Sequence, residues 1–265
     1  LFFLLTFVPF SDRLVCVMGI DKLLITFENA KLKGIWHYSL PSGWTCPGAL
    51  NCLTKADRET GKVTDKQTPV AGVSYRCYAA GMEGTYPSVR KARWDNLDKL
   101  ARAKTVKGMT ELICDSIPQG LRTVGGYLRV HVGGDFFSYD YFDSWMEAAK
   151  RFPRVTFYSY TKSVQFLARY LQCSEALPSN YVFTCSSGGK FDHLAAGLGI
   201  KKATVFFSQE EIDGLGLDVD HTDEFAIHGK KDFGLLLHGI QPKGSKSGKA
   251  LRELKQKGFT GYKTA

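Results

Sequence analysis

The sequence has no uninterrupted apolar run of about 18 or more residues, the length that a membrane-spanning helix needs. It also lacks the composition of disordered or fibrous chains, since 44% of its 265 residues are hydrophobic and 23% are charged. No internal repeat is evident. These absences exclude membrane-spanning, fibrous and disordered classes, and a chain of this length can bury a sizeable core.

The first residues have neither flank of a signal peptide. Residues 1–10 (LFFLLTFVPF) are apolar, but no basic segment precedes them and no small-residue cleavage site follows them. The first methionine is Met18. We interpret residues 1–17 as a non-native or disordered extension and residues 18–265 as a single domain.

Short β-rich runs alternate with helical patterns along most of the chain, which indicates βαβ units with parallel strands. The fold class predicted is α/β, a partial (β/α) barrel with mainly parallel strands. Strands are expected at residues 128–132, 155–160, 181–184, 203–207 and 233–238, with a sixth at 225–228. Helices are expected at 88–104, 109–117, 139–150, 164–171, 192–198 and 249–257. The domain divides into a loop-rich cysteine region (18–87), a β/α core (88–240) and a basic C-terminal tail and helix (241–265).

Positive charge exceeds negative charge, with a formal net charge of +9. The excess is compatible with a polyanionic partner such as nucleic acid, although no recognised binding module is present. Arg90, Lys91 and Arg93 lie beside Trp94 in a predicted helix. They are either contacts for a phosphate backbone or a solvated helix face.

The seven cysteines form an odd number in a chain too large to need disulfide bonds. We interpret them as reduced thiols, which indicates a cytoplasmic setting. The alternative is that they are small buried hydrophobic residues. Cys114 lies in an apolar helical pattern and is expected to pack in the core, whereas Cys173 is ambiguous and Cys16 belongs to the excluded segment.

Three cysteines lie in Gly- and Pro-containing loops that can wrap around a metal. Five residues separate Cys46 from Cys52, and Cys77 follows after 24 more. Thiolates bind zinc or iron–sulfur clusters, and zinc ribbons use shorter gaps between paired cysteines, so the spacing favours iron–sulfur over zinc. Cys185 is a fourth candidate, because it ends a predicted parallel strand, where barrel enzymes place their chemistry.

Three other groups are candidates at predicted strand ends. Gly133-Gly134-Asp135 either lets a ligand approach the backbone, with the carboxylate holding an amine, or forms an ordinary turn. Lys162 either pairs with a carboxylate or phosphate, or is solvated. His238 is either a general acid–base group or ligand, or a hydrogen-bonded structural histidine.

Five segments occur in this order along the chain: GWTCPGALNC, RCYAAGMEGTYPSVRKARWDN, RVHVGGDFFSYDYFDSW, FYSYTKS and LLLHGIQPKGS. In this order and spacing they resemble a bacteriophage family known as gene product eighty-eight. The similarity extends from about Ile35 to Tyr262. The family is similar in turn to radical S-adenosylmethionine (SAM) enzymes, partial barrels in which three cysteines hold a 4Fe–4S cluster. The implied location is the cytoplasm of an infected bacterium.

The resemblance implies a site and two functions. Cys46, Cys52 and Cys77 take the cluster positions, and Gly133, Gly134 and Asp135 take those of the motif that contacts the methionine part of SAM. The cysteine gaps differ from the three- and two-residue gaps usual in radical SAM enzymes.

If Cys185 leaves one iron open, the protein is an enzyme that cleaves SAM reductively and modifies a substrate, with Lys162 and His238 near the reacting groups. If Cys185 closes the cluster, the protein is an electron carrier, a sensor or a module that binds nucleic acid or a host protein. A zinc-stabilised form is a third alternative.

Overall fold

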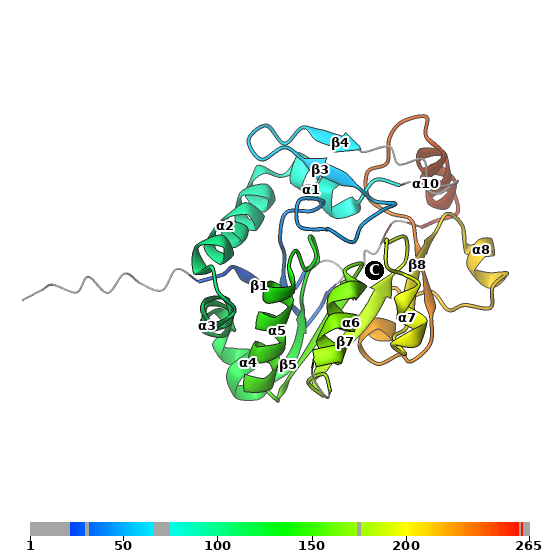
Figure 1. Ribbon diagram of the computed structural model, residues 1–265. Helices are drawn as coiled ribbons and strands as arrows, with labels where there is room; N and C mark the ends of the chain where they lie inside the picture. Colours follow the sequence, from blue (N-terminus) through cyan, green and yellow to red (C-terminus); the bar gives the residue numbers. More distant parts are fainter. Residues whose placement is uncertain (1–21, 30–31, 66–74, 174–175, 260, 262–265) are drawn as a thin grey trace, which may run out of the picture.

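The fold is known from a computed structural model, which describes residues 22–29, 32–65, 75–173, 176–259 and 261. These residues form a mixed α/β structure with a seven-stranded sheet and a separate two-stranded hairpin (Figure 1). Within the described residues, no helix has the length and apolar character needed to cross a membrane. The predicted extension, residues 1–17, lies outside the described part.

The main sheet is mostly parallel. Its strand order is β1-β2-β5-β6-β7-β8-β9; β1 pairs antiparallel with β2, and each later neighbouring pair is parallel. The loops that follow β5 to β9 therefore share one edge of the sheet, the carboxyl edge. The strands are β1 (Ile25–Phe27), β2 (Trp36–Tyr38), β5 (Gly126–Arg129), β6 (Val155–Thr161), β7 (Tyr181–Ser186), β8 (Lys202–Phe206) and β9 (Phe233–Leu236).

Ten helices lie in the described residues, and several begin with a side-chain cap. Ser138, Ser208 and Ser245 each accept a hydrogen bond from a backbone N–H in the first turn of the helix that follows. The helices are α1 (Tyr78–Thr85), α2 (Pro87–Ala103), α3 (Val106–Ser116), α4 (Gln119–Val124), α5 (Tyr139–Arg151), α6 (Val164–Cys173), α7 (Leu194–Gly197), α8 (Gln209–Asp213), α9 (Glu224–Ile227) and α10 (Lys246–Gln256).

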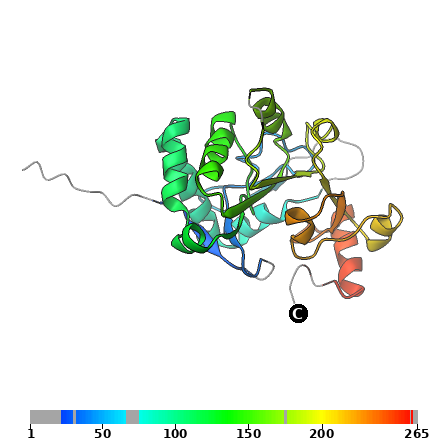
Figure 2. The same cartoon turned by 90° about the horizontal axis from the view of Figure 1, so that it is seen from below.

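Both faces of the sheet are buried, as expected for parallel strands. On one face Phe157 packs with fully buried Trp145 of α5, with ring centroids 6.2 Å apart. Its neighbour Tyr158 points to the other face and belongs to a second core with Phe233 and with Ala226 of α9. Figure 2 shows the green helices along one face and the orange segment across the other.

The structure confirms the α/β class and the mainly parallel strands. The neighbouring parallel strands β5 to β9 follow one another in sequence, which suits a partial barrel, and the partial barrel itself stays a prediction. A separate antiparallel hairpin is formed by β3 (Thr54–Ala56) and β4 (Val63–Asp65).

Two strand predictions need correction. The predicted strand at 225–228 is wrong, since α9 occupies it and packs its apolar residues on the sheet. The strand predicted at 128–132 instead ends at Arg129, and the chain turns at His131, which has a φ of 71°.

Candidate functional site

The loop between β2 and β3 carries Cys46 and Cys52 to the carboxyl edge of the sheet. Leu40 N–H donates to Gly133 O at 2.8 Å, and Leu50 N–H donates to Gly188 O at 3.2 Å. Gly48 lies against the Lys162 carbonyl with no room for a Cβ atom. The loop is therefore fixed on the segments that follow β5, β6 and β7.

Cys46 and Cys77 approach this edge from different segments. Cys46 Sγ accepts a hydrogen bond from Gly43 N–H at 3.2 Å. Cys77 is the N-cap residue of α1, and its backbone N–H donates to Thr54 Oγ1 at 3.2 Å. The structure thus brings the loop, the β3–β4 hairpin and the start of α1 together, and Figure 1 shows α1 and the hairpin above the sheet.

The three thiols share one electrostatic environment. Burial raises the pKa of Cys46 well above its usual value, and Asp135, Cys52 and Cys77 raise it further. Burial and then Cys52 raise the pKa of Cys77 to about 11. Burial also raises the pKa of Cys52, while the Lys162 charge opposes the rise. The isolated thiols therefore stay protonated near neutral pH, and a metal would have to displace their protons.

Three partly buried cysteines form a donor set that iron–sulfur clusters and soft metals use. Across the described ranges of the chain, however, no group of three or more His, Cys, Asp or Glu side chains has the arrangement of a metal site. The site therefore matches a cluster in the chemistry of its donors, and cluster binding stays a prediction.

Cys185 of β7 has a different environment from the other three candidates. Its side chain is fully buried in a small apolar cluster with Val164 and Ala195. Its thiol is 3.8 Å from Asp192 Oδ1, and burial followed by the Asp192 charge raises its pKa to about 12. These contacts place Cys185 in the layer beneath α6 and α7. Its role as a fourth ligand stays a prediction.

The remaining described cysteines differ in exposure. Cys114 is buried and belongs to the main core, which agrees with the predicted packing role. Cys173 is exposed at the end of α6. Cys16 lies outside the described residues.

Asp135 ties together the loops after β5 and β6. Its carboxylate accepts hydrogen bonds from Thr161 Oγ1 at 2.6 Å, Lys162 N–H at 2.8 Å and Phe136 N–H at 2.8 Å. The side chain is buried, and burial raises the Asp135 pKa although these donors oppose the rise. The carboxylate thus has a structural role, and a contact with SAM stays a prediction.

The two glycines before Asp135 lie against protein atoms. A Cβ atom on Gly133 would stand 2.5 Å from Arg93 Nη1, and one on Gly134 would stand 2.6 Å from Thr45 Oγ1. Gly134 also has a φ of 82°, which favours glycine. Close packing accounts for both glycines, and their predicted role in SAM binding is not tested by these contacts.

Lys162 is buried beside the cysteine site. Its Nζ donates to Ser186 O at 2.7 Å and to Ser187 O. Burial disfavours the ammonium, but nearby negative charges, including those of Tyr75 and Cys52 in their ionised forms, raise the Lys162 pKa overall. The alternative of a solvated lysine is therefore wrong, and a positive charge lies close to Cys52.

His238 reaches the same region from the loop after β9. Its ring lies 4.7 Å from the ring of Tyr78, the residue that follows Cys77. His238 Nδ1 lies 3.1 Å from Leu236 O, and Tyr78 donates to Val132 O at 2.7 Å. The structure thus places His238 beside the cysteine segment, while its predicted catalytic role stays untested.

The candidate site residues lie within the part of the chain that matches a protein-family model. A protein-family model described as gene product 88 matches residues 17–256. The chain belongs to the gene product 88 family. This match confirms the bacteriophage family predicted from the sequence and includes every candidate site residue. No curated protein and no solved structure matches the chain.

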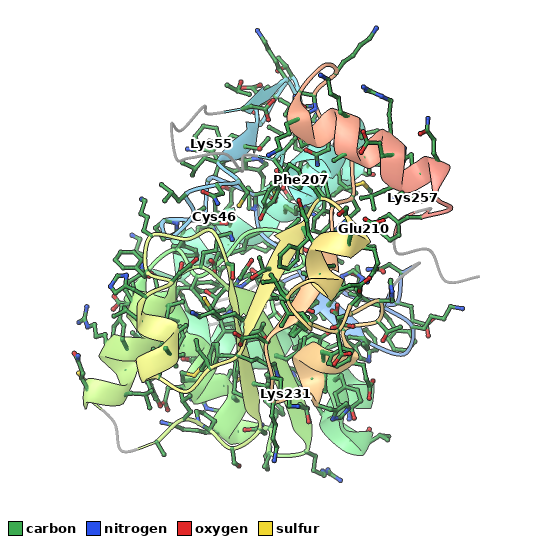
Figure 3. The ribbon with its side chains drawn as sticks, turned by 90° about the vertical axis from the view of Figure 1, so that its right-hand side faces the viewer. Cys46, Lys55, Phe207, Glu210, Lys231 and Lys257 are labelled. Carbon is green, nitrogen blue, oxygen red and sulfur yellow. The ribbon has the colours of Figure 1, made fainter. Side chains whose placement is uncertain are left out.

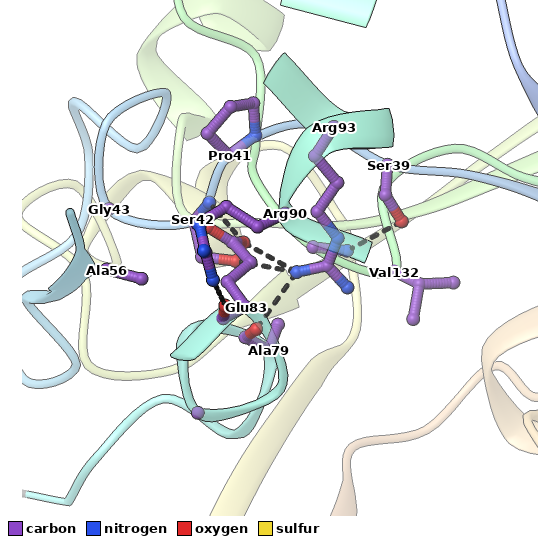
Figure 4. Close-up of polar contacts among 12 residues, drawn as sticks. Ser39, Pro41, Ser42, Gly43, Ala56, Ala79, Glu83, Arg90, Arg93 and Val132 are labelled. Atoms are coloured by element: carbon purple, nitrogen blue, oxygen red, sulfur yellow. Dashed lines mark hydrogen bonds and ion pairs between the residues drawn. The ribbon is translucent and has the colours of Figure 1, made fainter. Parts of the chain in front are cut away.

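Sequence reasoning missed one buried side chain, Glu83, and gave its partner Arg93 a wrong role in this member of the gene product 88 family. Glu83 of α1 and Arg93 of α2 form an ion pair at 2.6 Å, with side chains 0% and 8% exposed (Figure 4). The interpretation of Arg90 and Arg93 as phosphate contacts or a solvated face is wrong, because both are buried and bond backbone carbonyls. The signal for Glu83 is its position after the small residues Ala79–Gly81, which allow close packing.

Proposed function

We propose that this protein is an iron–sulfur protein in which Cys46, Cys52 and Cys77 hold a 4Fe–4S cluster. The observation that supports the proposal is that these three thiols lie close enough for the charge of one to raise the pKa of another. Cys46 and Cys52 come from the loop between β2 and β3, and Cys77 comes from the start of α1. Packing alone gives no reason for this convergence of thiols at the carboxyl edge, where α/β proteins build their sites.

The surroundings of Cys185 favour iron–sulfur over zinc. A structural zinc site normally has four protein ligands, whereas the contacts of Cys185 are Asp192 and the apolar residues Val164 and Ala195. A set of three cysteines suits a cluster in which one iron takes a small molecule. The family resemblance gives SAM as that molecule, and the bound cluster would then supply the electron that cleaves it.

The protein's own residues would orient and balance this site. Asp135 fixes the two loops on which the cysteine loop rests. Lys162 places a buried ammonium near Cys52, which offsets the negative charge of thiolate ligands. His238 and Tyr78 form one wall beside Cys77, where a substrate for the enzyme function would be held.

The test is anaerobic purification followed by iron, sulfide and zinc analysis. We expect a brown protein with about four irons per chain, and we expect Cys46→Ala, Cys52→Ala and Cys77→Ala to lose the iron. Cys185→Ala and Cys114→Ala are the controls and should retain it. Dithionite and SAM are then added, and adenosyl product identifies the enzyme. Colourless protein that carries zinc, or cluster loss in Cys185→Ala, would contradict the three-cysteine proposal.

A second candidate function, nucleic-acid binding, is supported by one surface. Helix α10 buries Ala250, Leu251 and Leu254 against the protein, so its opposite face is held toward solvent. Figure 3 shows α10 on the outside of the molecule, with nitrogen-tipped side chains extending from it. The exposed basic residues of this segment, which we name the α10 basic face, are Lys243, Lys246, Lys249, Arg252, Lys255 and Lys257.

Few acidic side chains offset the positive charge of the α10 basic face. Glu253 is the one acidic residue between residues 243 and 257, and Lys257 pairs with Glu210 at 2.6 Å. Closely spaced cations on a rigid helix suit the phosphate backbone of nucleic acid, which they contact without reading sequence.

The binding test uses a labelled DNA duplex of mixed sequence at several salt concentrations. In the Lys249→Gln/Arg252→Gln/Lys255→Gln variant we expect weaker binding. The slope of log K against log salt concentration should also become shallower by about 0.9 for each phosphate that the variant no longer neutralises. The control is Lys33→Gln/Lys107→Gln/Lys231→Gln, which removes three exposed lysines elsewhere. Equal effects of the two triple variants would contradict a contact through α10.

A further inference from the structure

We propose that the buried Glu83–Arg93 pair is a positioning device that holds the Cys46 loop, the start of α1 and the Gly133 turn in one arrangement. The inference rests on the proposed function in one respect, because the thiols that the ion pair would position are the proposed cluster ligands. Three sets of contacts carry the inference (Figure 4).

The first set reaches the Cys46 loop. Ser42 N–H donates to Glu83 Oε1 at 2.9 Å, and Arg93 Nη1 lies 3.4 Å from Ser42 Oγ. The next residue, Gly43, donates its N–H to Cys46 Sγ at 3.2 Å. The position of the Cys46 thiol is therefore linked to the ion pair through two consecutive residues of the loop.

The second set reaches the helix that begins after Cys77. Arg93 Nη1 donates to Ala79 O at 2.9 Å, and Ala79 lies two residues after Cys77, the N-cap residue of α1. Glu83 belongs to the same helix, and its carbonyl accepts a hydrogen bond from Arg90 Nη1 at 2.7 Å. The pair thus fixes the first turn of α1, which faces Cys77.

The third set reaches the turn before Asp135. The space beside Gly133 is filled by the Arg93 guanidinium, since a Cβ atom there would lie 2.5 Å from Nη1 and 2.6 Å from Cζ. Gly133 N–H donates to Ser39 Oγ at 3.2 Å, which joins the same turn to the start of the cysteine loop. The guanidinium therefore packs between three segments that are distant in sequence.

The chemistry of the pair explains why these residue types are needed. Arg93 makes its contacts with Glu83, Ala79 and Ser42 through Nη1 alone, while Cζ and Nη2 of the same planar group fill the space beside Gly133. A lysine ammonium is a point charge on a flexible stem and would not fill that space. Glu83 Oε1 accepts hydrogen bonds from Arg93 Nη1 and from Ser42 N–H, so the carboxylate compensates the buried guanidinium and holds the loop at the same atom.

The test measures cysteine accessibility in the metal-free full-length protein, so that it does not depend on iron. Iodoacetamide labelling is followed for each cysteine by peptide mass spectrometry. In Arg93→Lys and Glu83→Gln we expect Cys46 and Cys77 to be labelled roughly tenfold faster or more, because the local structure opens more often. Cys114, which lies in the main core, should keep its rate.

Gly133→Ala provides an independent variant, because it keeps both charges and displaces the guanidinium by contact. Gly133→Ala should reproduce the labelling pattern of Arg93→Lys. If the charge variants do not fold, the labelling of Gly133→Ala alone decides the test. Its control is Gly120→Ala, where a Cβ atom meets nothing within 4 Å. Unchanged labelling of Cys46 and Cys77 in Gly133→Ala would overturn the proposal.

A control for general loss of stability is Arg129→Lys, which weakens a second buried ion pair, Arg129–Asp223. The same labelling pattern in Arg129→Lys, or an equal rise at Cys114, would show a merely structural effect and overturn the proposal. If the wild-type protein binds no iron but the labelling pattern is as expected, the proposed function fails and the positioning role stands.

Discussion

The backbone N–H of Lys162 donates to Asp135 Oδ2 at 2.8 Å, which joins the first loop residue after β6 to the loop after β5. The adjacent Thr161 hydroxyl donates to the other carboxylate oxygen at 2.6 Å. The cysteine loop rests on this junction, because Gly48 lies against the Lys162 carbonyl. One buried carboxylate therefore aligns two strand ends and the loop that carries Cys46.

The Asp135→Asn variant tests this junction. The amide nitrogen of asparagine would face an N–H or O–H donor, so one buried hydrogen bond is removed and the free energy of unfolding should fall by about 1–3 kcal/mol. Urea unfolding of the metal-free protein measures the change. The exposed Asp218→Asn is the control, and a decrease of equal size there would contradict the role of Asp135.

The pH dependence of stability should reflect His131. Burial lowers its pKa from 6.5 to about 3, so between these values the unfolded chain binds a proton that the folded protein excludes. The free energy of unfolding should therefore fall as pH decreases below 6.5, by up to about 1.4 kcal/mol per pH unit from this residue. Unfolding of wild type and His131→Gln at several pH values measures it. A variant with the same acid dependence as wild type would refute this assignment.

Metal binding should release protons from the cysteine site. Because burial raises the pKa values of Cys46, Cys52 and Cys77, each thiol must lose a proton near pH 7.5 to become a ligand. Cobalt(II), used as a probe of thiolate ligation, should release about three protons per site. Calorimetry in buffers of different ionisation enthalpy counts them. Cys52→Ser should release about one fewer, Cys114→Ser should match wild type, and release independent of these cysteines would contradict the site.

Lys162 should raise the reduction potential of the proposed cluster. Its buried ammonium lies in the field of Cys52, so Lys162→Met removes a positive charge and should lower the reduction potential, on the order of 50 mV. Lys190 is a matched control, because its Nζ also donates to a carbonyl of the cysteine loop, Pro47 O at 2.8 Å, but the side chain is exposed. A redox titration that gives equal potentials for Lys162→Met and wild type would contradict this role.

The helices and strands were largely predictable because their periodicity is local. The pattern of apolar residues placed a helix at 139–150 and strands at 155–160 and 181–184, which agree with α5, β6 and β7. The segment 225–228 was mistaken for a strand, because a single helical turn is too short to show a period. Helix α2 begins at Pro87, one residue before the predicted start at residue 88.

The candidate site was predictable only as a set of residue types. The sequence singled out the cysteines, Asp135 and Lys162, and the structure brings Cys46, Cys52, Cys77, Asp135 and Lys162 into one region. The sequence offered no reason to expect a different environment for Cys185. That environment depends on the helices that cover β7 and on the apolar residues that pack around the thiol.

The sequence by itself determined the α/β class, the family and the thiol chemistry that this chain offers, because these depend on local pattern and on residue type. Only the tertiary structure decided which side chains meet. The distances that join Glu83 to Arg93 and Asp135 to Thr161 depend on how helices and loops pack at the sheet edge, and burial there gives these pairs their strength. Packing of that kind links residues far apart in the chain, and no local pattern records it.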